Sequence, residues 1–497
     1  MRIVLAVFVY LTIAGSAFGA LPNAVQINNQ PGGWQIYPGQ GYRYGPTIIA
    51  NKDGSIDMWF AASCYDGKHW DQIRYRHSAD GGHTWECRES EHPGLSGQPD
   101  DVVVVTPTDG SPDLYSCCDP GAIRFGGYYY VGYTSVDNPP GMRNHVFLAR
   151  SKSPRGPYEK WNGKGWGGDP VPWLKYTGKD PNQWGCGEPS FVLKDGKLYA
   201  YYTWNDGKLY VNLAVCNNPF VDDWPAHMVL KGYVLRHGGA PGEDSIDVKY
   251  VDDLKRFVAV ATYNRIFNIN STISVWQSAD GISWIRMPFR GARVQTGAHN
   301  AGISGNEQGH ITRGMKTFIS YAYGWPGKDF TAQDFGWANW ATFIDPISIS
   351  TTSFGNPVQV EVSSAVDWDH SGPFAIDGDP ETSWSSKAHD SPDAEEWAYV
   401  WLGGPYAVDG LEVTPAKNGF PIDFKLQHSQ DGKKWTDIKS FTNYPKPDKP
   451  IKLMFGKTIT ASRFRILAQK LSQDESGSYS LQLGEITTIP RPTSPNR

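Results

Sequence analysis

Cysteine is scarce in this chain, with 6 residues among 497, and the cysteines follow no metal-binding pattern. No Cys-X-X-Cys pair and no histidine-rich spacing is present. Their absence argues against a metal–thiolate centre.

An excess of charge of one sign is also missing, because 46 basic residues face 51 acidic ones and the two kinds are interspersed. The net charge of −5 therefore predicts no attraction for nucleic acid and no basic patch for a membrane surface. No sustained heptad or amphipathic helical pattern occurs. Beyond the first 20 residues, no apolar run is long enough to span a bilayer.

Aromatic and turn-forming residues are abundant instead, with 20 Trp, 26 Tyr, 54 Gly and 36 Pro. This composition is typical of an all-β secreted protein that handles sugars. The length predicts two or more domains.

Residues 1–20 predict a cleaved signal peptide and hence a secreted protein, extracellular or periplasmic. Arg2 precedes an apolar run from Ile3 to Ala14, and small residues follow up to Ala20. A membrane anchor is the alternative, but the run is shorter than the roughly 20 residues that a span needs.

A repeated unit predicts a five-bladed β-propeller over residues 21–350. Each unit has a short apolar strand, a tight turn and an aromatic-rich strand, and the units begin near positions 45, 119, 188, 247 and 301. Three consecutive units begin with an acid, namely Asp119, Glu188 and Asp247, whereas the first has Gly45 and the fifth has Ala301. We therefore expect three carboxylates to face one axial funnel.

Two Ser-X-Asp-Gly segments, ending at Trp85 and Trp284, resemble Asp boxes and predict hairpin turns with a structural role. An oxidising compartment would allow the cysteines to pair in 15 ways. Pairs between Cys64 and Cys87 and between Cys186 and Cys216 would each staple one blade.

A different pattern begins near residue 351 and predicts a second domain over 351–490. Its landmarks, among them residues 377–384 and 397–403, resemble a discoidin-like (coagulation factor type C) domain, a galactose-binding jelly roll that often serves as a carbohydrate-binding module. The resemblance implies a structural calcium ion, which prefers hard oxygen ligands; the residues that match the ligand positions are Asp377, Asp379, Thr382 and Glu485. Loop residues that could contact a sugar are Lys387, His389, Tyr406 and Asn418.

The propeller resembles the five-bladed glycosidases, chiefly glycoside hydrolase family 43 and its neighbours. The matching segments are Asp119-Pro120-Gly121, Glu188-Pro189-Ser190-Phe191 and the stretch 149–158. In that family an Asp of the first blade acts as the catalytic base, and this chain has Gly45 there. The resemblance therefore leaves one catalytic position without an acid.

Glycosidic cleavage requires one protonated carboxyl group and one ionised carboxylate. We expect Glu188 to be the acid, because an Asp on each side would raise its pKa. Asp119 is then the favoured base, acting through water with inversion, and Asp247 the group that tunes the pKa or orients the sugar. Alternatively, any of these carboxylates could cap backbone amides and lock the blades together, and Glu243 and Asp244 could be acids of a loop.

Residues at strand starts and loops around the funnel are candidates to hold the substrate, a polysaccharide or oligosaccharide containing arabinose, xylose or galactose. They are His237, Arg265, His299, Trp204 and Trp184, with Asn300 and Trp325 nearby. Ordinary core packing is the alternative for the tryptophans. No cofactor is expected for catalysis. The competing hypotheses are a sialidase-like exo-glycosidase and a non-catalytic lectin.

Overall fold

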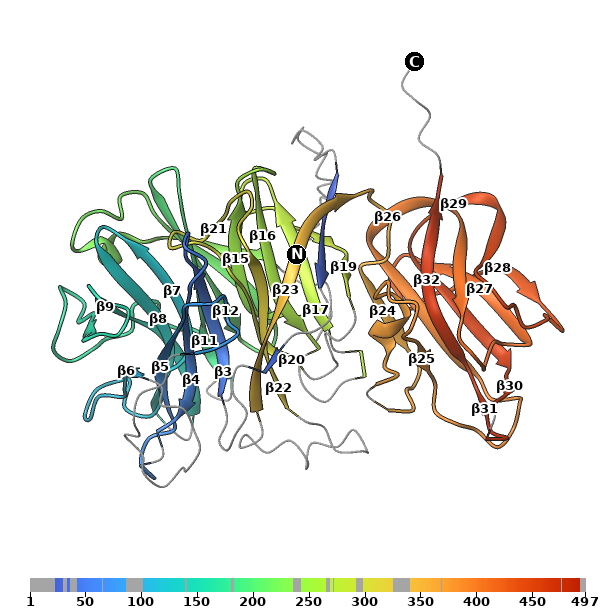
Figure 1. The fold of residues 1–497 in the computed structure, drawn as a ribbon, viewed down its shortest axis with the longest axis horizontal. Helices are drawn as coiled ribbons and strands as arrows, with labels where there is room; N and C mark the ends of the chain where they lie inside the picture. The colour runs from blue at the N-terminus through green and yellow to red at the C-terminus, as the bar shows by residue number, and fades with distance from the viewer. Residues whose placement is uncertain are drawn as a thin grey trace, which may run out of the picture.

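The structure, a computed structural model, describes residues 23–29, 34–35, 43–64, 66–85, 102–138, 141–179, 183–235, 243–264, 269–270, 272–291, 298–324, 340–367, 369–474 and 476–491. Two all-β domains lie side by side: a propeller, coloured blue to yellow in Figure 1, and a sandwich, coloured orange to red. The described residues include two short 3-10 helices, η1 (Trp224–His227) and η4 (Gly372–Ala375), and no α-helix.

Five blades, each of four main antiparallel strands, form the propeller, as the sequence predicts, and one parallel bridge between Gly185 and Asn144 joins blades 2 and 3 into a single sheet. Blade 1 contains β3 (Arg43–Ala50), β4 (Ile56–Ser63), β5 (Asp71–Ser78) and β6 (Val102–Val105). Blade 2 contains β7 (Cys118–Phe125), β8 (Tyr128–Asn138), β9 (Gly141–Ser151) and β10 (Glu159–Lys160). Blade 3 contains β11 (Gly185–Lys194), β12 (Lys197–Asn205), β13 (Leu209–Cys216) and β14 (Val229–Leu235). Blade 4 contains β15 (Glu243–Val251), β16 (Arg256–Tyr263), β17 (Thr272–Ser278) and β18 (Ile285–Met287).

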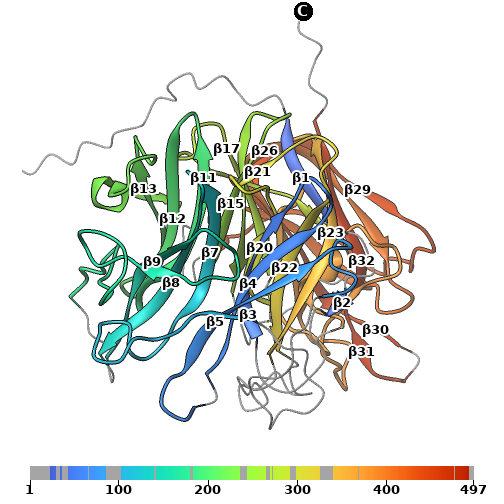
Figure 2. The same ribbon diagram turned by 60° about the vertical axis from the view of Figure 1, so that its left-hand side comes forward.

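The fifth blade closes the ring with a strand from the other end of the domain. Its first three strands are β20 (Ala298–Ile303), which is the innermost, β22 (Thr317–Gly324) and β23 (Trp340–Thr352). The fourth, β1 (Ala24–Asn29), pairs antiparallel with β23. Figure 2 shows β1 beside β23. Three short strands, β2 (Trp34–Gln35), β19 (Phe289–Arg290) and β21 (His310–Ile311), pair with β23, β1 and β15. β1 is therefore the fourth strand of blade 5, and its pairing with β23 joins the start of the propeller to its end and closes the ring of blades.

Most residues of the innermost strands are buried, because each of these strands is packed between two neighbouring blades. In β11, every residue from Gly185 to Leu193 is buried. Gly121 of β7 shows how close the strands come, because a Cβ atom there would lie 1.8 Å from the carbonyl oxygen of Pro189. Only glycine fits at that point.

The predicted Asp boxes form turns with the expected hydrogen bonds. Asp80 Oδ1 accepts from the backbone N–H of Thr84, and Asp280 Oδ1 accepts from the N–H of Ser283, both at 2.8 Å. A third turn of this kind, which the sequence reasoning missed, lies in the second domain, where Asp431 Oδ1 accepts from Lys433 N–H at 2.8 Å. These turns are structural in both domains.

The pairing of Cys186 with Cys216 is wrong, because both are free, buried thiols. Cys186 of β11 lies opposite Trp204 of β12, whereas Cys216 of β13 lies opposite Leu198. Six residues of an extended strand separate these points, roughly 20 Å and far beyond disulfide reach. Cys87 lies outside the described residues, and the thiol of Cys64 is free.

The second domain is a β-sandwich built around two strands of 20 residues each, β26 (Glu396–Pro415) and β29 (Ile451–Lys470). Both shift register near Trp401 and Val408, so that each strand contributes to both layers. The remaining strands are β24 (Gln359–Val362), β25 (Trp384–Ser385), β27 (Asp423–Ser429), β28 (Thr436–Phe441), β30 (Ser472–Gln473), β31 (Tyr479–Ser480) and β32 (Gln482–Pro490). One continuous apolar core fills the space between the layers.

Hydrogen bonds join the sandwich to blade 4 and to β19, the short strand that pairs with β1 of blade 5. Propeller strand β23 ends at Thr352 and sandwich strand β24 begins at Gln359, so a short joint links the domains. Arg290 Nη1 donates to the carbonyl of Ile376 at 2.6 Å, and the Tyr263 hydroxyl donates to Glu361 at 3.2 Å. The sandwich is therefore held against the propeller by specific contacts as well as by the joint.

Candidate functional site

A β-bulge occurs at the same point of every inner strand of the propeller. The register shifts fall between Tyr44 and Thr47, Cys118 and Gly121, Gly187 and Ser190, Asp244 and Asp247, and His299 and Gly302. The first residue inside each bulge has a positive φ: Gly45 (61°), Asp119 (47°), Glu188 (57°), Ser245 (54°) and Asn300 (49°). Left-handed residues other than glycine are uncommon and cluster at functional sites, as do bulges.

The bulges correct the predicted register in the fourth and fifth blades. Ser245, and not Asp247, occupies the position equivalent to Asp119 and Glu188, and Asn300, and not Ala301, completes the set. Two acids therefore share the equivalent position, where the sequence pattern counted three. The sequence reasoning also passed over Ser245 because it searched only for acids.

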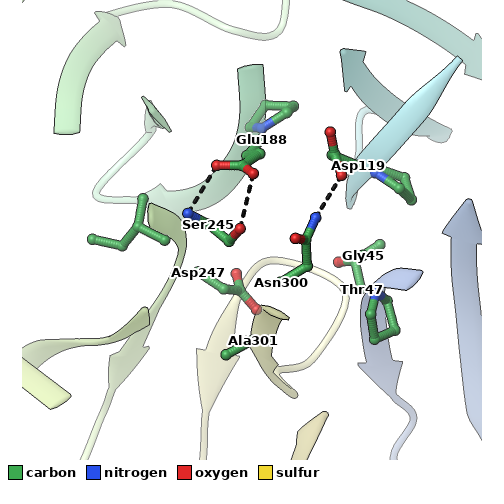
Figure 3. A pocket seen from close by; sticks show the side chains of 13 residues that line it. Gly45, Thr47, Asp119, Glu188, Ser245, Asp247, Asn300 and Ala301 are labelled. Atoms are coloured by element: carbon green, nitrogen blue, oxygen red, sulfur yellow. Dashed lines mark hydrogen bonds between the residues drawn. The ribbon is translucent and has the colours of Figure 1, made fainter. Parts of the chain in front are cut away.

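One pocket on the propeller axis brings the bulge residues together (Figure 3). Its empty space, counted together with the solvent at its mouth, is about 320 Å³. All three predicted carboxylates line it. The complete lining comes from the innermost strands of the five blades and consists of Gly45, Pro46, Thr47, Asp119, Pro120, Glu188, Pro189, Ser245, Ile246, Asp247, Asn300, Ala301 and Gly302.

Glu188 is held by the neighbouring blade. Ser245 donates its backbone N–H to Oε2 and its hydroxyl to Oε1, each at 2.8 Å (Figure 3). Glu188 N–H in turn donates to the hydroxyl of Thr134 at 2.8 Å. Only 8% of Glu188 is exposed, so these contacts fix its carboxyl group at the wall of the pocket.

Asp119 lies in the adjacent blade and is oriented by an amide. Asn300 Nδ2 donates to Asp119 Oδ1 at 2.5 Å. A Cβ atom at Gly45 would lie 3.3 Å from that Asp119 oxygen and 3.2 Å from Asn300 Nδ2. A side chain at Gly45 would therefore crowd Asp119 and Asn300 and would be strained by the positive φ of 61°, so the first blade disfavours the acid that the resemblance to family 43 would place there.

Asp247 has three partners that tie blades 3, 4 and 5 together. Its Oδ1 accepts from the Ser190 hydroxyl at 2.6 Å and from the Lys249 ammonium, and its Oδ2 accepts from Ile303 N–H at 2.8 Å. In Figure 3 it lies beside Ala301, below Glu188 and Asp119. This is the blade-locking arrangement, and the charge of Lys249 weakens the argument that Asp247 tunes Glu188.

The predicted substrate residues that the structure describes are largely packed. His299 is buried, and its ring is stacked on Tyr44 with centroids 6.0 Å apart. Trp204 lies 4.7 Å from the ring of Tyr176, and Trp184 is half-buried directly before β11. His237, Arg265 and Trp325 lie outside the described residues.

Glu243 and Asp244 are strand residues, not loop acids. They begin β15, and both are almost fully buried. Glu243 pairs with Arg286, with Oε1 and Nη1 3.2 Å apart. Burial raises the pKa of Glu243, while Arg286 and the Ser274 hydroxyl act in the opposite direction.

The four predicted calcium ligands lie in one region of the module, where some of their oxygen atoms are close together. Thr382 Oγ1 lies 2.9 Å from Asp377 Oδ2 and 3.1 Å from the carbonyl of Asp379, and Glu485 Oε2 accepts from Gly378 N–H at 3.0 Å. Burial raises the pKa of Asp377 to about 6 and that of Glu485 to about 7. This donor set, two carboxylates with a hydroxyl and a carbonyl, has the chemistry that calcium prefers. Among the described residues, however, no group of three or more His, Cys, Asp or Glu side chains is placed to hold a metal.

The sandwich residues proposed to contact sugar lie in different settings. Lys387 is exposed and Asn418 is half-buried. His389 Nε2 lies 2.7 Å from Glu396 Oε1, and Tyr406 is stacked on a phenylalanine of the joint at 6.2 Å. These contacts leave Lys387 as the most accessible of the four.

Comparison with known proteins identifies the second domain. Residues 359–483 match the family model of the F5/8 type C domain, so the discoidin-like module is present. The chain matches no curated protein. The described residues contain no helix long and apolar enough to cross a membrane.

Some of the solved structures similar to this chain are glycoside hydrolases, and others are carbohydrate-binding modules that cover 26% of it. One described as a glycoside hydrolase is 14% identical, with 93% of this chain and 100% of the other covered and a TM-score of 0.40. A family 117 glycoside hydrolase from Zobellia galactanivorans is 15% identical, with 65% and 91% covered and a TM-score of 0.42. The α-L-arabinofuranosidase PaAbf62A from Podospora anserina, solved with cellotriose, is 12% identical, with 66% and 98% covered and a TM-score of 0.40. The strand order given above, and not these distant likenesses, defines the fold: a five-bladed propeller followed by an F5/8 type C module.

Proposed function

We propose that the protein is a glycoside hydrolase whose catalytic carboxyl groups are Asp119 and Glu188. The observation that carries the proposal is the pair of left-handed bulge residues, in adjacent blades, whose carboxyl groups line one axial pocket. Each is oriented by a donor from another blade, Asn300 for Asp119 and Ser245 for Glu188. Two oriented carboxyl groups beside one pocket are what glycosidic cleavage requires.

Glu188 is the proposed proton donor. Its Oε2 accepts a backbone N–H, so the proton of the acid form belongs on Oε1, beside the Ser245 hydroxyl. That proton passes to the glycosidic oxygen as the bond to the anomeric carbon breaks. In the same step Asp119 acts as the base and takes a proton from the water that attacks the opposite face of the anomeric carbon, with inversion.

Asp247 has a structural role in this proposal, because its carboxylate is committed to Lys249, Ser190 and Ile303. The substrate class is a polysaccharide or oligosaccharide, and the F5/8 type C module keeps the enzyme near it. We further propose that residues 1–20 are removed on secretion, which N-terminal sequencing of the exported protein would test. Mature protein that begins at Met1 would contradict export by this route.

A hydrolysis screen over arabinose-, xylose- and galactose-containing glycans tests the activity. Glu188→Gln and Asp119→Asn should each lower the rate by about 10²- to 10⁴-fold, because each removes one proton-transfer group. Glu307→Gln is the matched control, since Glu307 is a half-buried acid outside the pocket that pairs with Arg124. Proton NMR of the first product formed reads the anomeric configuration and thus tests inversion.

Two outcomes would contradict the proposal. If the wild type binds glycans and cleaves none of them, the protein is a lectin. If Glu188→Gln retains the wild-type rate, Glu188 is not the proton donor.

A further inference from the structure

Arg286 is a fully buried arginine at the boundary between the two domains. It belongs to β18, and its side chain is 0% exposed. Its guanidinium lies 4.8 Å from the ring centre of Tyr263 and 5.7 Å from that of Trp276, both in blade 4. A third ring, Trp401 of the F5/8 type C module, lies 5.3 Å away. The module therefore supplies one wall of the cage around this cation.

The positive charge of Arg286 pairs with a buried acid, Glu243, on the innermost strand of the same blade. Arg286 Nη1 lies 3.2 Å from Glu243 Oε1, and 1% of the Glu243 side chain is exposed. Ser274 donates its hydroxyl to the other carboxylate oxygen. A buried ion pair is costly to break from one side, because the remaining charge loses its partner away from water.

Glu243 anchors the start of the strand that positions Glu188. It is the first residue of β15, and Ser245 follows two residues later. Ser245 must keep a φ of 54° while both its N–H and its hydroxyl donate to the carboxyl group of Glu188. A left-handed serine persists only where its surroundings hold it, and here the strand end before it is fixed by the Glu243–Arg286 pair.

We propose that the F5/8 type C module is part of the framework of the axial pocket, in addition to any sugar binding of its own. Trp401 holds Arg286, Arg286 holds Glu243, and Glu243 fixes the end of β15 that carries Ser245. The three are positioning residues, and they act on Glu188 through Ser245. The catalytic consequence rests on the proposed function, but the positioning of Glu188 is measurable without any substrate.

The first test is carbodiimide labelling of Glu188 in the full chain, read by peptide mass spectrometry. Trp401→Ala should raise the labelling rate about tenfold, the effect of losing one net hydrogen bond to the carboxyl group. Trp435→Ala is the matched control, because the partners of Trp435, Arg465 at 4.3 Å and Tyr399 at 5.3 Å, both belong to the module. Equal labelling in wild type and in Trp401→Ala would overturn the proposal.

Folding and activity are separated from positioning by two more measurements. Melting curves show whether Trp401→Ala is folded. If it is not, Trp401→Leu, which keeps apolar volume without a ring face, carries the labelling test with the same expected and contradicting results. Once a substrate is found, Trp401→Ala should lower kcat with little change in KM, and Trp401→Phe should restore kcat. A change in KM alone would overturn the positioning role, whereas absence of any hydrolysis by wild type would refute the proposed function and leave the labelling result to decide the positioning.

Discussion

Replacement of Asp247 by asparagine distinguishes a blade-locking carboxylate from a catalytic one. The side chains of Asp247 and Lys249 are 12% and 6% exposed, so the substitution leaves an ammonium group buried beside a neutral amide. Breaking a buried ion pair from one side costs about 3–5 kcal/mol. Because Asp247 also accepts from Ile303 and Ser190 of the neighbouring blades, we expect a loss in this range.

The assay is unfolding in urea, followed by tryptophan fluorescence, for a double-mutant cycle. The single variants are Asp247→Asn and Lys249→Met, and the double variant combines them. Removing both charges should recover part of the loss, with a coupling energy of about 1–3 kcal/mol, as is found for residues in direct contact. Glu188→Gln should unfold at nearly the wild-type urea concentration, because it removes no buried charge pair.

A stable Asp247→Asn variant without hydrolytic activity would refute this reasoning. That result would return Asp247 to the catalytic group that the sequence pattern suggested. An unstable variant that retains activity per folded molecule supports the structural role. The two measurements must therefore be made on the same preparation.

Three further outcomes are expected. Gly121→Ala should destabilise the propeller by about 1–3 kcal/mol or more, because its Cβ atom would overlap the next blade's backbone, whereas Gly165→Ala, with open space around it, should be neutral in thermal melting. Burial raises the pKa of Glu485 to about 7, so without calcium the folded state should lose stability as pH rises from about 4.5 to 7. Calcium should therefore raise the melting temperature more at pH 8 than at pH 5. An equal effect at both pH values, or none, would contradict the predicted ligand role. Cys186 and Cys216 should both react with a thiol reagent after denaturation without reductant, and failure of either to react would show that it is oxidised.

Much of the architecture could be predicted from sequence because it depends on local patterns. Aromatic strands and tight turns recur along the chain, and each unit folds into one blade. The Asp boxes at Asp80 and Asp280 are equally local, since the capping carboxylate lies within four residues of the amides it binds. The same holds for the landmarks of the F5/8 type C domain.

The roles of the acids depended on register and on distant partners. Counting from strand starts placed Asp247 with Asp119 and Glu188, but a bulge inserts residues without changing the apolar pattern, so the equivalent position is Ser245. Lys249 and Asp247 are two residues apart, and yet the other two partners of Asp247 lie more than 50 residues away in the sequence.

The sequence by itself determined the five repeated blades, the module that follows them and the presence of carboxylates near the axis. Only the tertiary structure decided that Asp119 and Glu188 share the bulge position, that Asp247 joins three blades and that Trp401 of the module encloses Arg286 of the propeller. The physical reason is that periodicity records which residues are buried. It does not record which partner from another blade or domain meets each buried charge.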